Sequence, residues 1–198
     1  MAASLAGGFT EERVVVLGIP RGGVVVAVPV AEALHAPLDV VVPRKLGAPG
    51  NPELAIGAIA PGVRVLDGQL LRSLGIPERY VEEEIERQEE EIRRRTERYR
   101  SGGAAATIAG ATVVIVDDGV ATGATAFAAL RWVRSQGAAR VVFATPVGPR
   151  GTIRSLAQEA DEVVVTETPL SFAAVGEWYE TFDQVQDDEV VRALEGRA

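Results

Sequence analysis

The chain has 198 residues, of which 47% are hydrophobic, and it carries a formal net charge of -8 with an isoelectric point of about 4.8. This length and apolar content suffice for the core of one domain, whereas the acidic balance disfavours nucleic acids and anionic membranes as partners. The sequence holds no cysteine, which excludes disulfides, thiolate catalysis and cysteine zinc sites. No run is long enough to span a membrane and no signal peptide opens the chain, so we expect a cytoplasmic protein.

Apolar, β-branched runs alternate with helical periodicity along most of the chain. The apolar runs predict buried strands at residues 14–18, 38–43, 113–116, 140–145 and 162–166. Helical segments are predicted at residues 24–34, 78–99, 126–136 and 150–160. This alternation predicts an α/β fold with a doubly wound, mainly parallel sheet of about five strands.

Four further segments complete the predicted domain. Residues 55–59 and 63–66 are predicted to form a hairpin around Pro61-Gly62. Residues 101–110 form a connector rich in glycine and alanine, and residues 1–13 show little helical pattern. The long helix at residues 78–99 is mostly charged and has one narrow apolar stripe. We predict that this stripe packs on its own domain, and packing in a homodimer interface is the alternative.

The turn after the first strand reads Gly-Ile-Pro-Arg-Gly-Gly, at residues 18–23. Arg21 supplies a positive charge beside the exposed backbone N–H groups of Gly22 and Gly23, which is a concavity suited to an anion. Taken alone, the turn is explained equally well as a glycine-rich connection with a solvent-facing arginine.

The second predicted strand is followed by Arg-Lys-Leu-Gly-Ala-Pro-Gly-Asn-Pro-Glu, at residues 44–53. Its two prolines and two glycines predict a mobile loop without regular structure. The loop begins with Arg44 and with Lys45, the single lysine among 20 basic residues. Such a loop could close over a polyanion and exclude water, although a solvated charge pair is the alternative.

The most informative stretch is Val-Val-Ile-Val-Asp-Asp-Gly-Val-Ala-Thr-Gly-Ala-Thr, at residues 113–125. The strand stops at Asp117 and Asp118, whose carboxylates accept hydrogen bonds from vicinal hydroxyls or reach a metal through water. The loop that follows leads into a helix N-terminus, whose N–H groups and dipole favour a phosphate. Its residues are Ala121, Thr122, Gly123, Ala124 and Thr125. Because open α/β sheets bind ligands at this edge, a phosphorylated sugar satisfies both halves of the stretch.

These 13 residues resemble the phosphoribosyl-pyrophosphate signature of type I phosphoribosyltransferases. Residues 18–23 resemble the pyrophosphate loop of that family, and residues 44–53 resemble its flexible catalytic loop in the form found in a less studied subgroup. The resemblance spans about residues 14–166 of a single domain and implies the type I fold, with a small C-terminal hood and helix at about residues 167–198. Subgroup members tend to have a helix before the first strand, so we expect the start of this chain to be truncated or misassigned.

The resemblance implies a transferase of nucleotide salvage that moves ribose 5-phosphate from Mg²⁺-bound phosphoribosyl pyrophosphate to a nitrogen acceptor, such as a nucleobase. Pyrophosphate would be bound by Arg21, Gly22 and Gly23, with Arg44 or Lys45 added on loop closure. Asp117 and Asp118 would hold the ribose hydroxyls and, through water and substrate, Mg²⁺. Residues 121–125 would bind the 5-phosphate.

The acceptor is less defined by the sequence. In the family a small hood often stacks on the nucleobase, so the resemblance implies Phe172, Trp178 or Tyr179 as the acceptor wall, with core packing as the alternative for each ring. Members that act on 6-oxopurines carry an aspartate where this chain has Ala121, which argues against such an acceptor. No general base for the acceptor is identified.

Two other functions remain open at this stage, because one fold serves many functions. A non-catalytic sensor of phosphoribosyl pyrophosphate or nucleotides is the main alternative. The basic loop and the lack of a DNA-binding module favour the enzyme. A phosphoribosyl hydrolase, or another sugar-phosphate enzyme that uses the same site, is the other possibility, since no general base constrains the acceptor.

Overall fold

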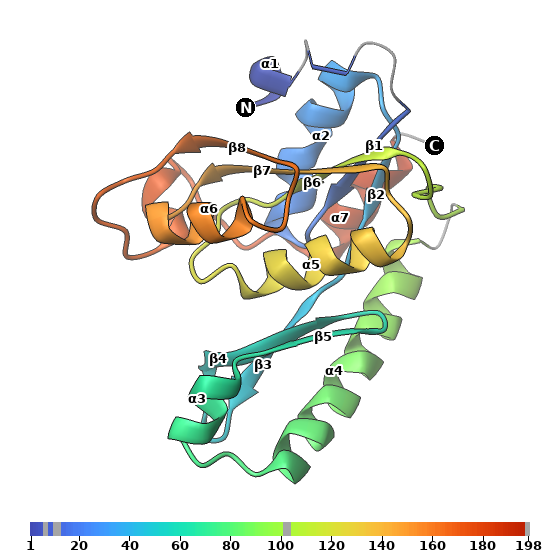
Figure 1. The fold of residues 1–198 in the computed structure, drawn as a ribbon. Coiled ribbons are helices and arrows are strands. Elements are labelled where there is room, and N and C mark those ends of the chain that lie inside the picture. The colour runs from blue at the N-terminus through green and yellow to red at the C-terminus, as the bar shows by residue number, and fades with distance from the viewer. Residues whose placement is uncertain (6–7, 10–12, 101–103, 197–198) are drawn as a thin grey trace.

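Two sheets organise the chain, and Figure 1 shows them as an upper and a lower layer. The computed structural model describes residues 1–5, 8–9, 13–100 and 104–196. The strands are β1 (Val14–Gly18), β2 (Leu38–Val40), β3 (Arg44–Ala48), β4 (Asn51–Ala60), β5 (Val63–Leu66), β6 (Thr112–Val116), β7 (Arg140–Val147) and β8 (Glu162–Glu167). The helices are α1 (Ala2–Leu5), α2 (Gly22–Leu34), α3 (Gly68–Ser73), α4 (Glu78–Tyr99), α5 (Ala124–Ser135), α6 (Arg150–Leu156), the 3-10 turn η1 (Val175–Trp178) and α7 (Asp187–Glu195).

The larger sheet has five parallel strands in the order β2-β1-β6-β7-β8. β1 and β6 lie side by side in the centre, with Gly18 opposite Val116 at their carboxyl ends. The predicted α/β fold with a five-stranded parallel sheet is therefore confirmed. Apolar runs rich in valine form these strands because a parallel sheet is covered on both faces.

Alternate side chains of this sheet enter two separate cores. Ile115 and Phe143 pack with residues of α5 and α6, whereas Val114 and Val142 pack with residues of α2. All four side chains are fully buried. Figure 1 shows the same division, with α2 on one face of the sheet and α5 and α6 on the other.

The smaller sheet is antiparallel and has the order β3-β4-β5. The predicted hairpin around Pro61-Gly62 is confirmed as β4 and β5. On the side toward the larger sheet, Ala58 and Ala60 of β4 pack against Ala128 of α5. Helix α5 therefore lies between the two sheets, and its N-terminal loop faces the space between them.

The prediction of an irregular loop at residues 44–53 is wrong, because this segment forms β3, a tight turn and the start of β4. Pro49 and Gly50 form the turn between the paired residues Ala48 and Asn51, with Gly50 at φ +71°. Gly47 pairs with Ala55, so residues 52–54 bulge out of the ladder. The glycines and prolines thus sit at a turn and a bulge, where a hairpin tolerates them.

Helix α4 occupies residues 78–99, as predicted. Its apolar face, which includes Val81, Ile85 and Ile92, packs in one core with residues of β2, β3 and β4. The preferred reading, in which this stripe packs on its own domain, matches the structure. The stripe also buries Glu84 and Gln88, two polar residues that are 5% and 6% exposed.

The C-terminal segment after β8 contains η1 and α7, and α7 packs in one core with α4 through Val190 and Tyr99. The prediction for the first residues of the chain needs correction. The first residues are not free of helix, since α1 forms one helical turn at Ala2–Leu5 and packs against the α2 side of the large sheet through Leu5. Residues 101–103 of the predicted connector lie outside the described residues.

Candidate active site

Two of the predicted motifs meet at the carboxyl edge of the parallel sheet. Gly22 and Gly23 begin α2 directly after the turn that follows β1, and the turn after the neighbouring β6 begins with Asp117 and Asp118. A Cβ on Gly22 would lie 1.9 Å from Oδ2 of Asp118, and one on Gly23 would lie 2.7 Å from the carbonyl oxygen of Val116. Since a side chain at either position would overlap these atoms, only glycine allows the two turns to touch.

The two carboxylates are held in a low-polarity environment. Asp117 is only 7% exposed. Oδ1 of Asp117 accepts a 3.0 Å hydrogen bond from the backbone N–H of Asp118. Burial and the neighbouring charge of Asp118 raise the pKa of Asp117 well above its usual value. Burial also raises the pKa of Asp118. Such a pair has a strong tendency to gain a cation or hydroxyl donors.

The small-residue loop forms the N-terminus of α5. Gly123 is the N-cap residue of this helix and has φ +79°, a conformation that favours glycine. The hydroxyl of Thr152 donates a 2.7 Å hydrogen bond to the carbonyl oxygen of Ala121, which fixes the start of the loop. A cavity of about 300 Å³ lies over it, lined by residues 119–125 and by Lys45, Glu53 and Ala55 of the small sheet.

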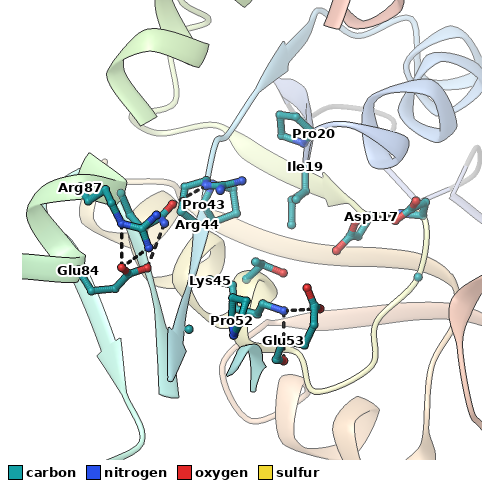
Figure 2. Close-up of a pocket in the computed structure, with 15 residues that line it drawn as sticks. Ile19, Pro20, Pro43, Arg44, Lys45, Pro52, Glu53, Glu84, Arg87 and Asp117 are labelled. Carbon is teal, nitrogen blue, oxygen red and sulfur yellow. Dashed lines mark hydrogen bonds and ion pairs between the residues drawn. The ribbon is translucent and has the colours of Figure 1, made fainter. Parts of the chain in front are cut away.

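A second cavity of about 490 Å³ lies between the two sheets (Figure 2). Its wall on the large sheet includes Ile19, Pro20, Asp117, Asp118, Gly119 and Thr125, and its wall on the small sheet and α4 includes Pro43, Arg44, Lys45, Gly47, Pro52, Glu53, Glu84, Arg87 and Gln88. Among the described residues, no aromatic side chain lines this cavity. It shares Lys45, Glu53, Gly119 and Thr125 with the cavity over the loop, so the two spaces are continuous.

The side chains of Lys45 and Arg44 enter this cavity from β3, but they bind different partners. The ammonium group of Lys45 donates to the carbonyl and carboxylate oxygens of Glu53, at 3.2 and 3.1 Å, because the bulge in β4 brings Glu53 over it. Nε of Arg44 donates to the side-chain oxygen of Gln88 at 2.8 Å. Burial, and then the positive charge of Arg95, lower the pKa of Arg44. The structure thus brings Arg44 and Lys45 to the cavity that holds the aspartate pair.

Three residues of α4 in this wall were not predicted from the sequence. They are Glu84, Arg87 and Gln88, whose spacing of three and four residues places them on one helical face. Glu84 accepts hydrogen bonds from Arg87 and, at 3.0 Å, from Nε2 of Gln88. The available signal was Gln88, an amide within a helix whose neighbouring polar residues are almost all glutamate and arginine.

The side chain of Arg21 points away from the space between the sheets. Its Nη1 lies 3.9 Å from Oδ1 of Asp187 in α7, and the same carboxylate is bonded by Tyr99 and Arg98 of α4. Arg21 and Gly22 instead line a third cavity of about 430 Å³ on the other side of Asp118. The backbone of the first turn therefore belongs to the aspartate site, while the guanidinium lies beside α7.

Aromatic residues of the C-terminal segment line this third cavity. The hydroxyl of Tyr179 donates a 2.6 Å hydrogen bond to the backbone carbonyl oxygen of Asp118, and the rings of Tyr179 and Phe182 lie 5.1 Å apart. Burial, and then the charge of Asp118, raise the pKa of Tyr179 to about 12. Of the three rings predicted for the acceptor, the structure brings only Tyr179 into this cavity. Phe172 and Trp178 do not line it, whereas Phe182 does.

A parallel α/β sheet that presents a glycine pair, an acidic pair and a helix N-terminus at one carboxyl edge belongs to the class of open α/β sheets, which bind ligands at that edge. The family model described as "Phosphoribosyl transferase domain" matches residues 1–185. The chain belongs to this family, and its fold is that of the type I phosphoribosyltransferases.

Relatives at high identity agree with this assignment. The chain is 50% identical over 188 residues to two proteins of Mycobacterium tuberculosis named "Putative phosphoribosyl transferase", from strains CDC 1551 and H37Rv. The matched segment covers 94% of this chain and 42% of each relative, so the chain spans less than half the length of these relatives. The crystal structure of TT1426 from Thermus thermophilus is 47% identical, with a TM-score of 0.82 over 100% of this chain and 93% of that one.

No helix in the described ranges is both long enough and apolar enough to cross a membrane.

Proposed function

We propose that this domain transfers the 5-phosphoribosyl group of phosphoribosyl pyrophosphate to a nitrogen acceptor. In this reaction the bond from C1 of the ribose to the pyrophosphate oxygen breaks, a bond from C1 to the acceptor nitrogen forms, and pyrophosphate and the proton of that nitrogen are released. The observation that carries the proposal is the contact of the Gly22 backbone with Asp118, beside the N-terminal loop of α5. At one edge of the large sheet, this contact brings together a helix N-terminus that would suit a phosphate, carboxylates that would suit hydroxyls, and backbone N–H groups that would suit a second anion.

Each part of the substrate has a matching group. The backbone N–H groups of residues 122–125 and the dipole of α5 favour the 5-phosphate. Asp117 and Asp118 would accept hydrogen bonds from the ribose hydroxyls, and their charge would stabilise the cationic ring of an oxocarbenium-like transition state. Gly22 and Gly23 would bind pyrophosphate through their N–H groups, and the guanidinium of Arg21 would have to leave Asp187 to take part.

The aspartate pair fits Mg²⁺ in its donor chemistry. Asp117 is buried and Asp118 is half-buried, and a cation relieves the repulsion between these two carboxylates with raised pKa values. No group of three or more Asp, Glu or His side chains within the described ranges could hold a metal by itself. This suits Mg²⁺, which keeps several waters and binds through one or two carboxylates together with substrate phosphates. When bound, the ion would neutralise charge on the leaving pyrophosphate.

Arg44 and Lys45 would contribute to catalysis from the small sheet. Both side chains line the cavity opposite the aspartate pair, where positive charge favours a leaving polyanion. Lys45 is exposed and paired with Glu53, so it has freedom to exchange that partner for a phosphate oxygen.

The acceptor would occupy the cavity beside Tyr179, on the other side of Asp118. The cavity combines the rings of Tyr179 and Phe182 with Val25 and Val26, which suits a planar ring better than the polar space between the sheets does. Phe172 and Trp178 remain candidates only if the C-terminal segment rearranges on binding.

The test is calorimetric titration with phosphoribosyl pyrophosphate, with and without Mg²⁺, followed by a screen for pyrophosphate release over nucleobases and other nitrogen acceptors. Mg²⁺-dependent binding with release for one acceptor would establish a transferase and name its substrate. Binding without release from any acceptor would favour a sensor. Absence of binding would contradict the proposal.

A further inference from the structure

Gln88 is the one amide side chain of α4. The ten positions from residue 82 to residue 91 hold seven glutamates, one isoleucine, one arginine and this amide. Gln88 is nevertheless 6% exposed, and both ends of its side chain are bonded: Nε2 donates to Glu84 at 3.0 Å and Oε1 accepts from Nε of Arg44 at 2.8 Å. Glu84 is in turn held by Arg87. The amide is therefore fixed in one orientation, with its oxygen toward Arg44.

Arg44 is a partly buried cation without a carboxylate partner among the described residues. Its one hydrogen bond goes to the neutral oxygen of Gln88, while every neighbouring arginine that lowers its pKa, Arg95 and Arg87, is paired with a glutamate. The guanidinium has five N–H donors, of which Gln88 uses one. Glu91, the nearby carboxylate whose charge acts on Arg44, is itself paired with Arg94 and Arg95. The remaining donors of Arg44 therefore favour an anion in the adjoining cavity.

An amide at position 88 orients Arg44 without neutralising it. A glutamate, which the rest of the helix uses freely, would give the same reach and a stronger bond but would quench the charge. We infer that Gln88 is a positioning residue that holds the Arg44 guanidinium unpaired at the cavity wall, so that Arg44 receives a diphosphate oxyanion of the ligand. This inference rests on the proposed function for the identity of the ligand, phosphoribosyl pyrophosphate.

The make-up of the cavity favours a diphosphate over a planar ring. Its lining holds three cations, Arg44, Lys45 and Arg87, together with Glu53, Glu84 and the aspartate pair, and no aromatic side chain of the described ranges. Lys45 and Arg87 are paired with Glu53 and Glu84, so among the described residues Arg44 is the cation of this wall that has no ion pair. It is continuous with the space over the α5 loop, where the 5-phosphate is proposed to bind. A ligand with a phosphate at one end and a diphosphate at the other would therefore extend from the α5 loop past the aspartate pair to Arg44.

The test compares three probes by calorimetry in the presence of Mg²⁺: phosphoribosyl pyrophosphate, inorganic pyrophosphate and ribose 5-phosphate, which lacks the diphosphate. For Gln88→Glu, we expect Kd to rise about tenfold or more for the first two, because a charged hydrogen bond is lost to the ligand. The Kd of ribose 5-phosphate should stay within about twofold. Gln158→Glu, at an exposed position after α6, adds the same charge and should change none of the three.

Gln88→Met provides a second variant if Gln88→Glu does not fold. It keeps the length of the side chain and the charge of Arg44 but removes the orienting bond, so we expect a smaller loss that is again restricted to the two diphosphates. A purely structural role for Gln88 would weaken all three ligands alike. Equal losses for the three probes, or no loss for the diphosphates, would overturn the inference.

The outcomes also separate this inference from the proposed function. Wild-type protein that binds phosphoribosyl pyrophosphate, with Gln88→Glu binding it equally well, would overturn the inference alone. Pyrophosphate binding that depends on Gln88, without any binding of phosphoribosyl pyrophosphate, would support the subsite and contradict the function. A wild-type protein that binds none of the probes would contradict both.

Discussion

The backbone of Gly22 lies directly against the carboxylate of Asp118, so that a Cβ on Gly22 would stand 1.9 Å from Oδ2 and 2.6 Å from Cγ. The contact joins the turns of two neighbouring parallel strands, β1 and β6. It leaves the backbone N–H groups of the first turn close to the charge of the second. A ligand that binds the aspartates is therefore also within reach of the backbone at the start of α2.

Gly22→Ala should disrupt this contact. The added methyl group must displace Asp118 or the turn, at a cost of about 1–3 kcal/mol in the free energy of unfolding, and it should weaken binding of phosphoribosyl pyrophosphate. Urea denaturation and calorimetry measure the two effects. Gly151→Ala is the matched control, because a Cβ there meets no atom within 4 Å, and in helix α6 it should leave stability equal or raise it by up to about 1 kcal/mol. Equal behaviour of the two variants would contradict the close approach.

Asp117→Asn should stabilise the ligand-free protein while removing function. Burial and the charge of Asp118 raise the pKa of Asp117, so the charged carboxylate is a destabilising element of the folded state at neutral pH. An amide in its place carries no charge and still offers Oδ1 to the backbone N–H of Asp118. We expect a higher Tm at pH 7 and loss of Mg²⁺-dependent phosphoribosyl pyrophosphate binding, more completely so when Asp118→Asn is added. A lower Tm would show that the carboxylate is needed for the fold.

The same raised pKa values predict how stability depends on pH. Below the pKa of an unfolded aspartate, about 3.9, both states are protonated and the pair costs nothing. As the pH rises from there through the raised pKa values, the unfolded state releases its protons first, so the stability of the ligand-free protein falls. The difference in Tm between the double Asn variant and the wild-type protein should therefore grow from pH 4 toward neutral pH. A constant difference would mean that the pair titrates normally.

Lys45→Ala should lower turnover more than it lowers affinity for the substrate in its ground state. The ion pair of Lys45 with Glu53 is exposed, so its loss should cost less than about 1 kcal/mol of stability. If Lys45 meets the leaving pyrophosphate in the transition state, we expect kcat to fall about tenfold or more with little change in the substrate Kd. Arg64→Ala is the control, since Arg64 forms a comparable exposed pair with Glu82 on the same sheet. An unchanged kcat for Lys45→Ala would show that this lysine has no role in turnover.

Phe182→Ala and Trp178→Ala should differ in their effect on the acceptor. Phe182 lines the cavity with Tyr179, whereas Trp178 lies outside it, although the two side chains are similarly exposed, at 49% and 42%. We expect Phe182→Ala to raise the KM of the acceptor about tenfold, as loss of a stacking ring costs about 1 kcal/mol or more, and Trp178→Ala to leave it unchanged. The KM of phosphoribosyl pyrophosphate should stay constant in both. The opposite ranking would move the acceptor to the other side of the C-terminal segment.

Local sequence patterns predicted most of the large sheet. Its strands are runs of valine and isoleucine and its helices have regular spacing, so each element can be recognised without knowledge of its neighbours. The segment at residues 44–53 was misjudged because proline and glycine mark turns and bulges as well as irregular loops. The choice depended on the pairing of Gly47 with Ala55, which is a contact between strands and not a property of the residues.

The candidate site shows the same difference between residues recognised from a local pattern and residues placed by contacts distant in the chain. Asp117, Asp118 and residues 121–125 were identified from one continuous stretch whose strand, turn and helix fix their geometry. Glu84 and Gln88 were not assigned to the site, because what brings them to the cavity wall is the packing of α4 on β3 and β4. Arg21 was assigned an anion site from its neighbours in sequence, while the position of its guanidinium follows from the fold of α7.

Local sequence was enough to predict the strands and helices of the parallel α/β sheet, the acidic turn and the small-residue loop before α5, because these depend on interactions within a few residues of each other. The folded arrangement alone shows that a second sheet and α4 form the opposite wall of the cavity, that Gln88 holds Arg44, and that Tyr179 and Phe182 are the rings beside Asp118. These contacts join residues far apart in the chain. They are set by the packing of whole elements, which no local pattern encodes.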